Sequence, residues 1–185
     1  MSWYRPIDGF SPLSRESLLA CTAALVLFLL YAAFNSSGFL FVDHANLMIH
    51  EVGHQLFAWA GYHTMILGGT LTQLLVPFGC MLLFLRRGEL AAVAVTAFWG
   101  FQNLLYIATY MADARRSALP LVGSDESDWT ILFTHWGVIQ HDLTIAAWTR
   151  GLGWVGMIGT LAWFITTGLS RTAAGPEGPY RRSPL

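Results

Sequence analysis

The order of apolar and polar positions along this chain is typical of a membrane protein. Residues 18–31 are almost wholly apolar, and Asn35-Ser36-Ser37-Gly38 then ends or kinks this first span before residue 42. Two further apolar runs, 71–85 and 90–111, each stop near a pair of arginines, and the last run predicts a final crossing at 154–169. A hydrocarbon core takes about 20 residues per helix. We therefore expect an all-α polytopic integral membrane protein with about four to six transmembrane or half-inserted helices.

Shorter elements are predicted between these spans. Asp43 is a suitable N-cap for a helix over residues 44–60, which Gly61 would close. Residues 61–70 contain two adjacent glycines and are too few to cross a membrane, so they predict a short irregular or extended segment. The run 141–169 is interrupted at 150–153, and residues 131–139 predict a short helix.

The domain organisation follows from the same pattern. Residues 1–16 mix aromatic, proline and charged positions, as interfacial segments do. Residues 17–170 form a single transmembrane domain, and 171–185 have no apolar period and predict a disordered tail. We expect a cytoplasmic amino terminus.

Composition narrows the class of protein. Hydrophobic residues make up 55% of the chain and charged residues 11%, an apolar excess that a water-soluble fold could not cover. The formal net charge is −1 and there is no basic run, so we expect no nucleic-acid partner. Cys21 and Cys80 are isolated in apolar runs and indicate packing rather than a disulfide or a thiolate metal site.

The motif with the clearest chemistry is His50-Glu51-Val52-Gly53-His54. A helix turns about 100° per residue, so His50 and His54 lie on one face, one turn apart, and can bind one zinc ion. Zinc lowers the pKa of a bound water molecule to about 7. Glu51 is then placed to act as general base towards that water and to pass its proton to the leaving amine. Ionisable side chains in an apolar helix are costly unless they are functional.

A catalytic zinc ion needs a third protein ligand. The loop that follows the third span offers carboxylates, of which Asp128 is our first choice, beside Trp129, and Asp125 is an alternative. His135 and His141 are further alternatives, since both lie on apolar-rich segments. Separately, the amide of Asn103 in the third span is a candidate contact for a substrate backbone.

A membrane helix with this motif, followed by Gly68-Gly69 and another span, resembles the site-2 protease family of intramembrane zinc metallopeptidases. The resemblance covers residues 43–129 and is to the smaller bacterial members. It implies zinc on His50 and His54, water activation by Glu51, and a downstream aspartate as third ligand. It also implies a membrane protein or peptide as substrate, and the bacterial inner membrane as location. The family's downstream aspartate signature is replaced here by residues 123–129.

Other functions use the same residues. A non-proteolytic membrane protein with a structural or metal-handling zinc site, or a subunit of a membrane complex, would have a closed site with a fourth ligand such as His135 or His141. A hydrolase acting on a lipid or another small amphiphile would need a cleft that opens towards the bilayer.

Overall fold

The computed structural model describes residues 9–121 and 126–173, and within them every regular element is a helix or a 3₁₀ turn. In chain order these are α1 (Arg15–Phe34), α2 (Asp43–Phe57), η1 (Ala58–Ala60), α3 (Tyr62–Arg87), α4 (Leu90–Ala112), α5 (Asp128–His135), η2 (Ile139–His141) and α6 (Asp142–Ala173). The four helices α1, α3, α4 and α6 are long and apolar enough to cross a membrane. The prediction of an all-α polytopic membrane protein is confirmed.

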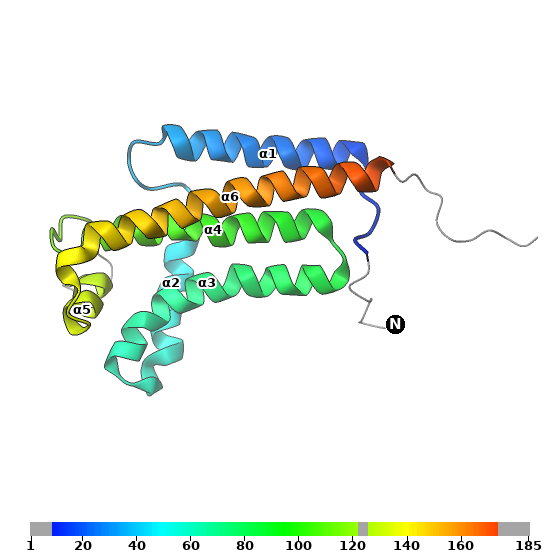
Figure 1. The fold of residues 1–185 in the computed structure, drawn as a ribbon. Coiled ribbons are helices and arrows are strands. Elements are labelled where there is room, and N and C mark those ends of the chain that lie inside the picture. Colours follow the sequence, from blue (N-terminus) through cyan, green and yellow to red (C-terminus); the bar gives the residue numbers. More distant parts are fainter. Residues whose placement is uncertain (1–8, 122–125, 174–185) are drawn as a thin grey trace, which may run out of the picture.

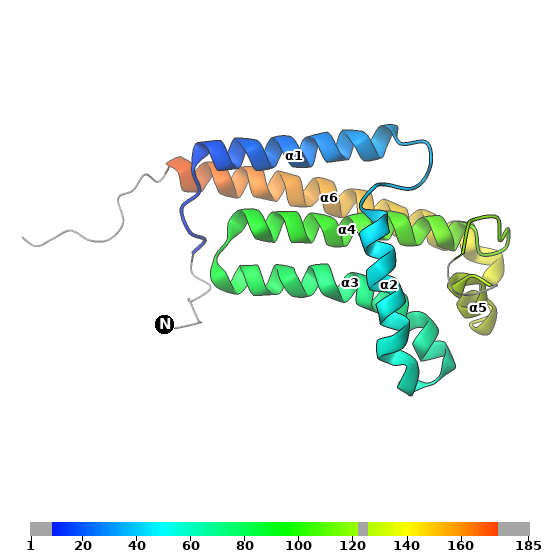
Figure 2. The same ribbon diagram turned by 180° about the vertical axis from the view of Figure 1, so that it is seen from behind.

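The four long helices lie side by side, with α4 between α3 and α6 (Figure 1). In the most apolar window of each helix, 61% of the residues of α4 are buried but only 11% of those of α1. The outer helix α1 therefore exposes leucines such as Leu19 and Leu27, as a lipid-facing helix does. The shorter helix α2 runs across the bundle instead of along it, as Figure 2 shows.

The two ends of the bundle differ in charge. The start of α1, the turn between α3 and α4 and the end of α6 meet at one end (Figure 1), which we call the arginine end because Arg15, Arg86, Arg87 and Arg171 lie there. The opposite end carries the connection between α1 and α2, helix α5 and the start of α6, and we call it the site end. At the site end, Arg115 pairs with Asp142 at 2.6 Å.

The irregular segment expected after the HExxH helix is shorter than predicted, and the break expected in the last span is absent. Only residues 58–61 interrupt the helices after α2, with φ of +94° at Gly61, and α3 already begins at Tyr62, so residues 62–70 are helical and not extended. Likewise α6 continues through 150–153 without a break. Inside a membrane a helix satisfies its own backbone hydrogen bonds. Gly68, Gly69 and Gly153 lie inside these helices and serve close helix packing, whereas Gly61 makes the turn.

The predicted ends of the domain are shifted slightly. Arg15 and Glu16 already belong to α1, and residues 171–173 belong to α6, so the transmembrane domain reaches a little further in both directions than 17–170. The rest of the expected interfacial segment up to residue 8, and of the expected tail from residue 174, lies outside the described residues.

A buried polar network holds the start of α2 against α4. The Asp43 carboxylate accepts hydrogen bonds from the backbone N–H of Leu40 (2.7 Å) and from the side-chain amides of Asn46 (3.0 Å) and Gln102 (2.8 Å). Asn46 also donates to Gln102 Oε1 and accepts from the indole N–H of Trp99. Because Asp43, Asn46 and Gln102 are buried and hydrogen-bonded to one another, the network fixes how α2 crosses the bundle.

Candidate metal centre

The HExxH motif lies at a very close crossing of α2 and α3. A Cβ atom on Gly53 would collide with the backbone carbonyl of Gly68 and would lie 2.8 Å from the Cα of Gly69. A Cβ on Gly69 would lie 2.7 Å from the imidazole of His50 and 2.8 Å from that of His54. The three glycines therefore let α3 approach until its backbone lies against both histidines, and they leave room for the two rings.

The side chain of Asp128 contacts both histidines, although it is 78 residues from His50 in the sequence. Its Oδ2 atom lies 2.8 Å from Nε2 of His50 and 3.2 Å from Nε2 of His54. The side chains of His50, His54 and Asp128 are 15%, 20% and 16% exposed, so the group is largely buried but remains accessible to water. Thus the first choice among the candidate third ligands lies where both imidazoles converge.

Helix α3 orients both imidazoles through contacts with their Nδ1 atoms. The backbone carbonyl of Met65 lies 3.0 Å from Nδ1 of His54, and the side-chain oxygen of Gln73 lies 3.2 Å from Nδ1 of His50. An Nδ1–H that donates to these oxygens leaves the lone pair of each Nε2 free to bind a metal. Sequence reasoning did not single out Gln73, although a glutamine within an apolar span was a signal.

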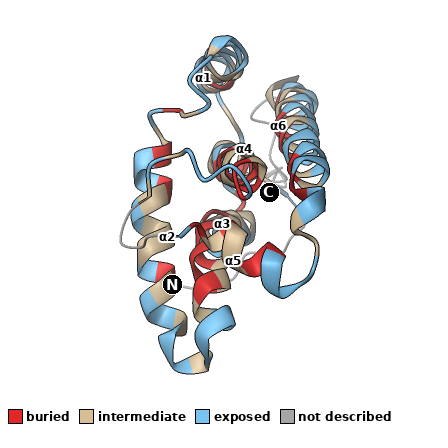
Figure 3. Cartoon of the chain, turned by 90° about the vertical axis from the view of Figure 1, so that its left-hand side faces the viewer, coloured by how far each residue is buried: buried red, intermediate tan, exposed pale blue. Residues whose placement is uncertain are grey.

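The position of Asp128 depends on how α5 packs. Asp128 is the first residue of α5, and the next residue, Trp129, is 6% exposed and packs in the core beside Ile107, Met111 and Phe133. In the end-on view of Figure 3, the buried residues of α5 face α3 and the core. The hydroxyl of Thr130 also donates to the carbonyl of Ala114 at 2.5 Å. The buried indole thus anchors the first turn of α5 and directs the carboxylate of Asp128 towards α2.

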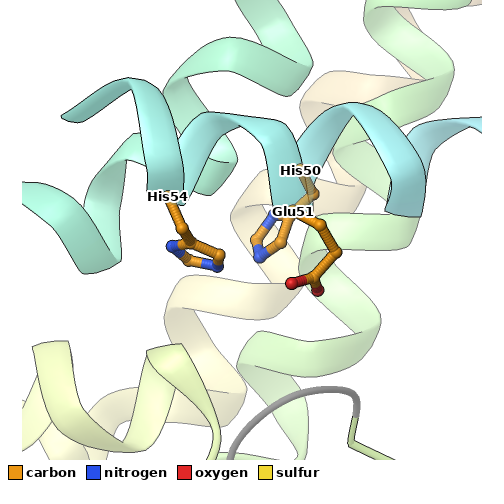
Figure 4. Close-up of side chains that lie close together, drawn as sticks. All are labelled: His50, Glu51 and His54. Atoms are coloured by element: carbon orange, nitrogen blue, oxygen red, sulfur yellow. The ribbon is translucent and has the colours of Figure 1, made fainter. Parts of the chain in front are cut away.

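Glu51 lies beside the two histidines. Figure 4 shows the side chains of His50, Glu51 and His54 projecting from the same side of α2, and one ligand atom from each lies within 4.8 Å of the others. Glu51 is half-buried and has no hydrogen-bond or ion-pair partner in the described part of the chain. A carboxylate with no other partner is available to accept a proton from a water molecule in the site.

The contact with Asp128 shifts the protonation of the group. The hydrogen bond to Asp128 raises the pKa of His54 to about 9, so without a metal this imidazole carries a proton on Nε2 that a metal ion has to displace. Burial acts to raise the pKa of Asp128, but the hydrogen bonds from His50 and His54 outweigh it and leave that pKa below its ordinary value. Asp128 is therefore an anion at neutral pH, as a carboxylate ligand of a metal must be.

Two of the separations between the candidate ligand atoms are compatible with a tetrahedral metal ion such as zinc. Ligand atoms about 2.0–2.2 Å from a tetrahedral ion are about 3.3 Å or slightly more from one another. The nitrogen-to-oxygen separations of 2.8 and 3.2 Å are within about 0.5 Å of that value. Two imidazoles and one carboxylate form the ligand set of many catalytic zinc sites, and they leave one coordination position for water or substrate.

The other candidate residues lie elsewhere. His135 stacks on His63, with ring centroids 3.5 Å apart, and His141 lies in the exposed turn η2, so neither is brought to His50 and His54. Asn103 is fully buried and donates to the carbonyl of Trp99 instead of lining the metal cavity described next. Asp125 lies outside the described residues.

A small cavity of about 50 Å³ opens on His50 and Asp128, two of the three candidate metal ligands. Its walls include His50, Gln73 and Asp128, together with the side chains of Tyr106 and Tyr110. One water molecule needs about 10–15 Å³ of such volume, so this metal cavity has room for a few waters or for a single peptide carbonyl. Tyr106 and Tyr110 belong to the last two turns of α4, so the cavity lies within about 10 Å of the site end of the bundle.

Comparison with known proteins assigns no family to the chain. No protein-family model, curated protein or solved structure matches it. The function is therefore argued from the site itself.

Proposed function

We propose that this chain is a membrane-embedded zinc metallopeptidase that resembles the site-2 proteases. The observation that carries the proposal is the convergence of three atoms, Nε2 of His50, Nε2 of His54 and Oδ2 of Asp128, beside the unpartnered carboxylate of Glu51. The fold supports it further, because the two helices that orient the histidines are held at contact distance by glycines on both sides. Three protein ligands would leave one coordination position open, as in catalytic rather than structural zinc sites.

The roles of the residues follow from their positions. His50, His54 and Asp128 would hold the ion, which would polarise the substrate carbonyl and lower the pKa of a bound water. Glu51 accepts a proton from the attacking water as the new carbon–oxygen bond forms. It then delivers this proton to the amine nitrogen as the peptide carbon–nitrogen bond breaks, so one water molecule is consumed for each bond cleaved.

The charge of the two ends supports an orientation in the membrane. Cytoplasmic ends of membrane helices carry an excess of arginine and lysine. In the described residues four arginines (Arg15, Arg86, Arg87 and Arg171) lie at the arginine end and three (Arg115, Arg116 and Arg150) lie towards the site end, where Arg115 pairs with Asp142. We place the arginine end in the cytoplasm and the metal centre near the opposite face of a bacterial inner membrane. A cytoplasmic amino terminus follows from the same assignment.

Removal of the metal tests the proposal directly. We expect zinc-loaded protein in detergent to cleave members of a panel of fluorogenic membrane peptides, and 1,10-phenanthroline to abolish this cleavage. The isomer 1,7-phenanthroline, which does not chelate, is the matched control, and added zinc should restore cleavage. Cleavage that continues in the chelator, once the zinc content is shown to be zero, would contradict the proposal.

The contact between Gln73 and His50 gives a second prediction. Gln73→Leu removes the oxygen that faces Nδ1 of His50, and we expect zinc affinity to fall about 10- to 100-fold because the ring loses its preferred tautomer and orientation. Gln73→Glu keeps an acceptor oxygen and should retain most of the affinity. Competition with a chelator of known affinity measures the change, with Gln140→Leu at the exposed Gln140 as control. Unchanged affinity in Gln73→Leu would show that this contact is not needed.

A further inference from the structure

A second and larger opening adjoins the metal cavity. It has a volume of about 320 Å³ and is lined mainly by Phe39, Leu40, Leu47, Tyr106, Tyr110 and Pro120. We call it the side groove. Leu47, Tyr106 and Tyr110 line the metal cavity as well, so the two spaces share one wall.

The two spaces differ in what they can hold. The metal cavity, at about 50 Å³, takes a carbonyl group and water but no large side chain. The side groove, at about 320 Å³, reaches the size of the smaller ligand pockets of proteins. A peptide with its carbonyl at the metal therefore has space for a neighbouring side chain in the side groove.

The walls of the side groove are apolar and aromatic. Phe39, Tyr106 and Tyr110 form a cluster with ring centroids 5.3–6.0 Å apart, in edge-on contacts. The hydroxyl of Tyr110 donates a hydrogen bond to the carbonyl of Pro120, at 3.1 Å. Such walls offer an incoming group dispersion and desolvation but few hydrogen bonds.

The polar residues of the side groove are already engaged. Asp43 is 4% exposed and its carboxylate accepts three hydrogen bonds from Leu40, Asn46 and Gln102. Nδ1 of His44 lies 3.1 Å from the backbone carbonyl oxygen of Phe41, within hydrogen-bond distance. Among the described residues a charged substrate group would meet mainly groups that are already hydrogen-bonded, and it would lose its hydration, which disfavours acidic and basic side chains as occupants.

We propose that the side groove is a substrate subsite that binds a large apolar side chain, aliphatic or aromatic, next to the peptide bond that is cleaved. This inference rests on the proposed function, because it takes the metal cavity as the place of the scissile carbonyl. The side groove thus selects substrates by one apolar residue, and Phe39, which touches only the groove and not the metal cavity, is a specificity-determining residue.

Hydroxamates test the subsite without a known substrate, because the hydroxamate group chelates zinc by itself. The probes are acetohydroxamic acid and two peptide hydroxamates that differ only in having leucine or glycine next to the chelating group. On zinc-loaded wild-type protein, we expect the leucine probe to bind about 10- to 100-fold more tightly than the glycine probe, because it buries one large apolar side chain. Isothermal titration in detergent measures the affinities.

Two variants localise the effect. Phe39→Ala should reduce the advantage of the leucine probe several-fold and leave the affinity for acetohydroxamic acid and the zinc content unchanged. Phe41→Ala is the matched control, since Phe41 lies two residues away in the same connection, is 68% exposed and does not line the groove. Phe39→Trp, which keeps an aromatic wall and narrows the groove, should lower the affinity for the leucine probe more than that for the glycine probe.

The outcomes separate this inference from the proposed function. Equal binding of the leucine and glycine probes, or a leucine advantage that survives both Phe39 variants, would overturn the subsite while leaving the metallopeptidase proposal standing. Failure of all three hydroxamates to bind zinc-loaded protein would show that the metal has no open position. That result would overturn the proposed function and the subsite together.

Discussion

Replacement of Glu51 by glutamine is expected to reduce peptide hydrolysis by about 10²- to 10⁴-fold, the range that loss of a general base causes. Glutamine has nearly the same size as glutamate but cannot accept the proton of the attacking water. The side chain has no other partner in the described residues, so the exchange disturbs no hydrogen bond. Zinc content should stay close to that of the wild type, because His50, His54 and Asp128 are unchanged.

Matched measurements distinguish a catalytic effect from a folding defect. Glu89→Gln, an exposed position at the arginine end, should cleave at the wild-type rate. Thermal unfolding of Glu51→Gln in detergent should be unchanged. If Glu51→Gln kept the full rate of cleavage on a substrate that the chelator protects, Glu51 would not be the base.

The second large effect concerns the metal itself. We expect His54→Ala and Asp128→Ala each to lose zinc, with a fall in affinity larger than the roughly 10- to 100-fold caused by loss of a hydrogen-bond partner of a ligand. The reason is that each removes one of the three atoms that converge within 3.2 Å. Metal analysis of the purified proteins, after adventitious ions are removed, gives the stoichiometry directly.

His63→Ala is the control for this experiment, because it removes an exposed imidazole that stacks on His135 outside the site. It should retain about one zinc per chain. Retention of zinc by Asp128→Ala together with its loss from His54→Ala would show that the third ligand is another residue. Absence of zinc from the wild type as well would remove the basis of the enzyme proposal.

Local patterns in the sequence were sufficient for several features. Long apolar runs predicted the crossings in α1, α3, α4 and α6, because a membrane imposes a minimum length and an apolar surface on each. The spacing of His50 and His54 predicted that they share a helix face, because helical periodicity is a property of the backbone alone. Asp128 was preferred from its position beside an aromatic residue, and the structure does place its carboxylate at the two histidines.

The errors came from glycines. Gly61, Gly68 and Gly69 indicated a turn or an extended piece, but only Gly61 lies outside a helix, and the other two lie in α3 where they meet α2. In α6, Gly153 lies against the backbone carbonyl of Phe101 and the side chain of Leu105. A glycine that breaks a helix and a glycine that admits a neighbouring helix are alike in one sequence, and only the packing partner distinguishes them.

The sequence by itself determined the all-helical membrane class, the location of the long apolar runs, and the pairing of His50, Glu51 and His54 on one helix, because periodicity and burial in lipid act over single helices. The tertiary structure decided which distant residues complete the site. Asp128 reaches the histidines because Trp129 is buried in the core, and Gln73 faces His50 because glycines let α2 and α3 approach. These contacts join segments that are 23 and 78 residues apart, and such distances are set by how helices pack against each other and not by any local pattern.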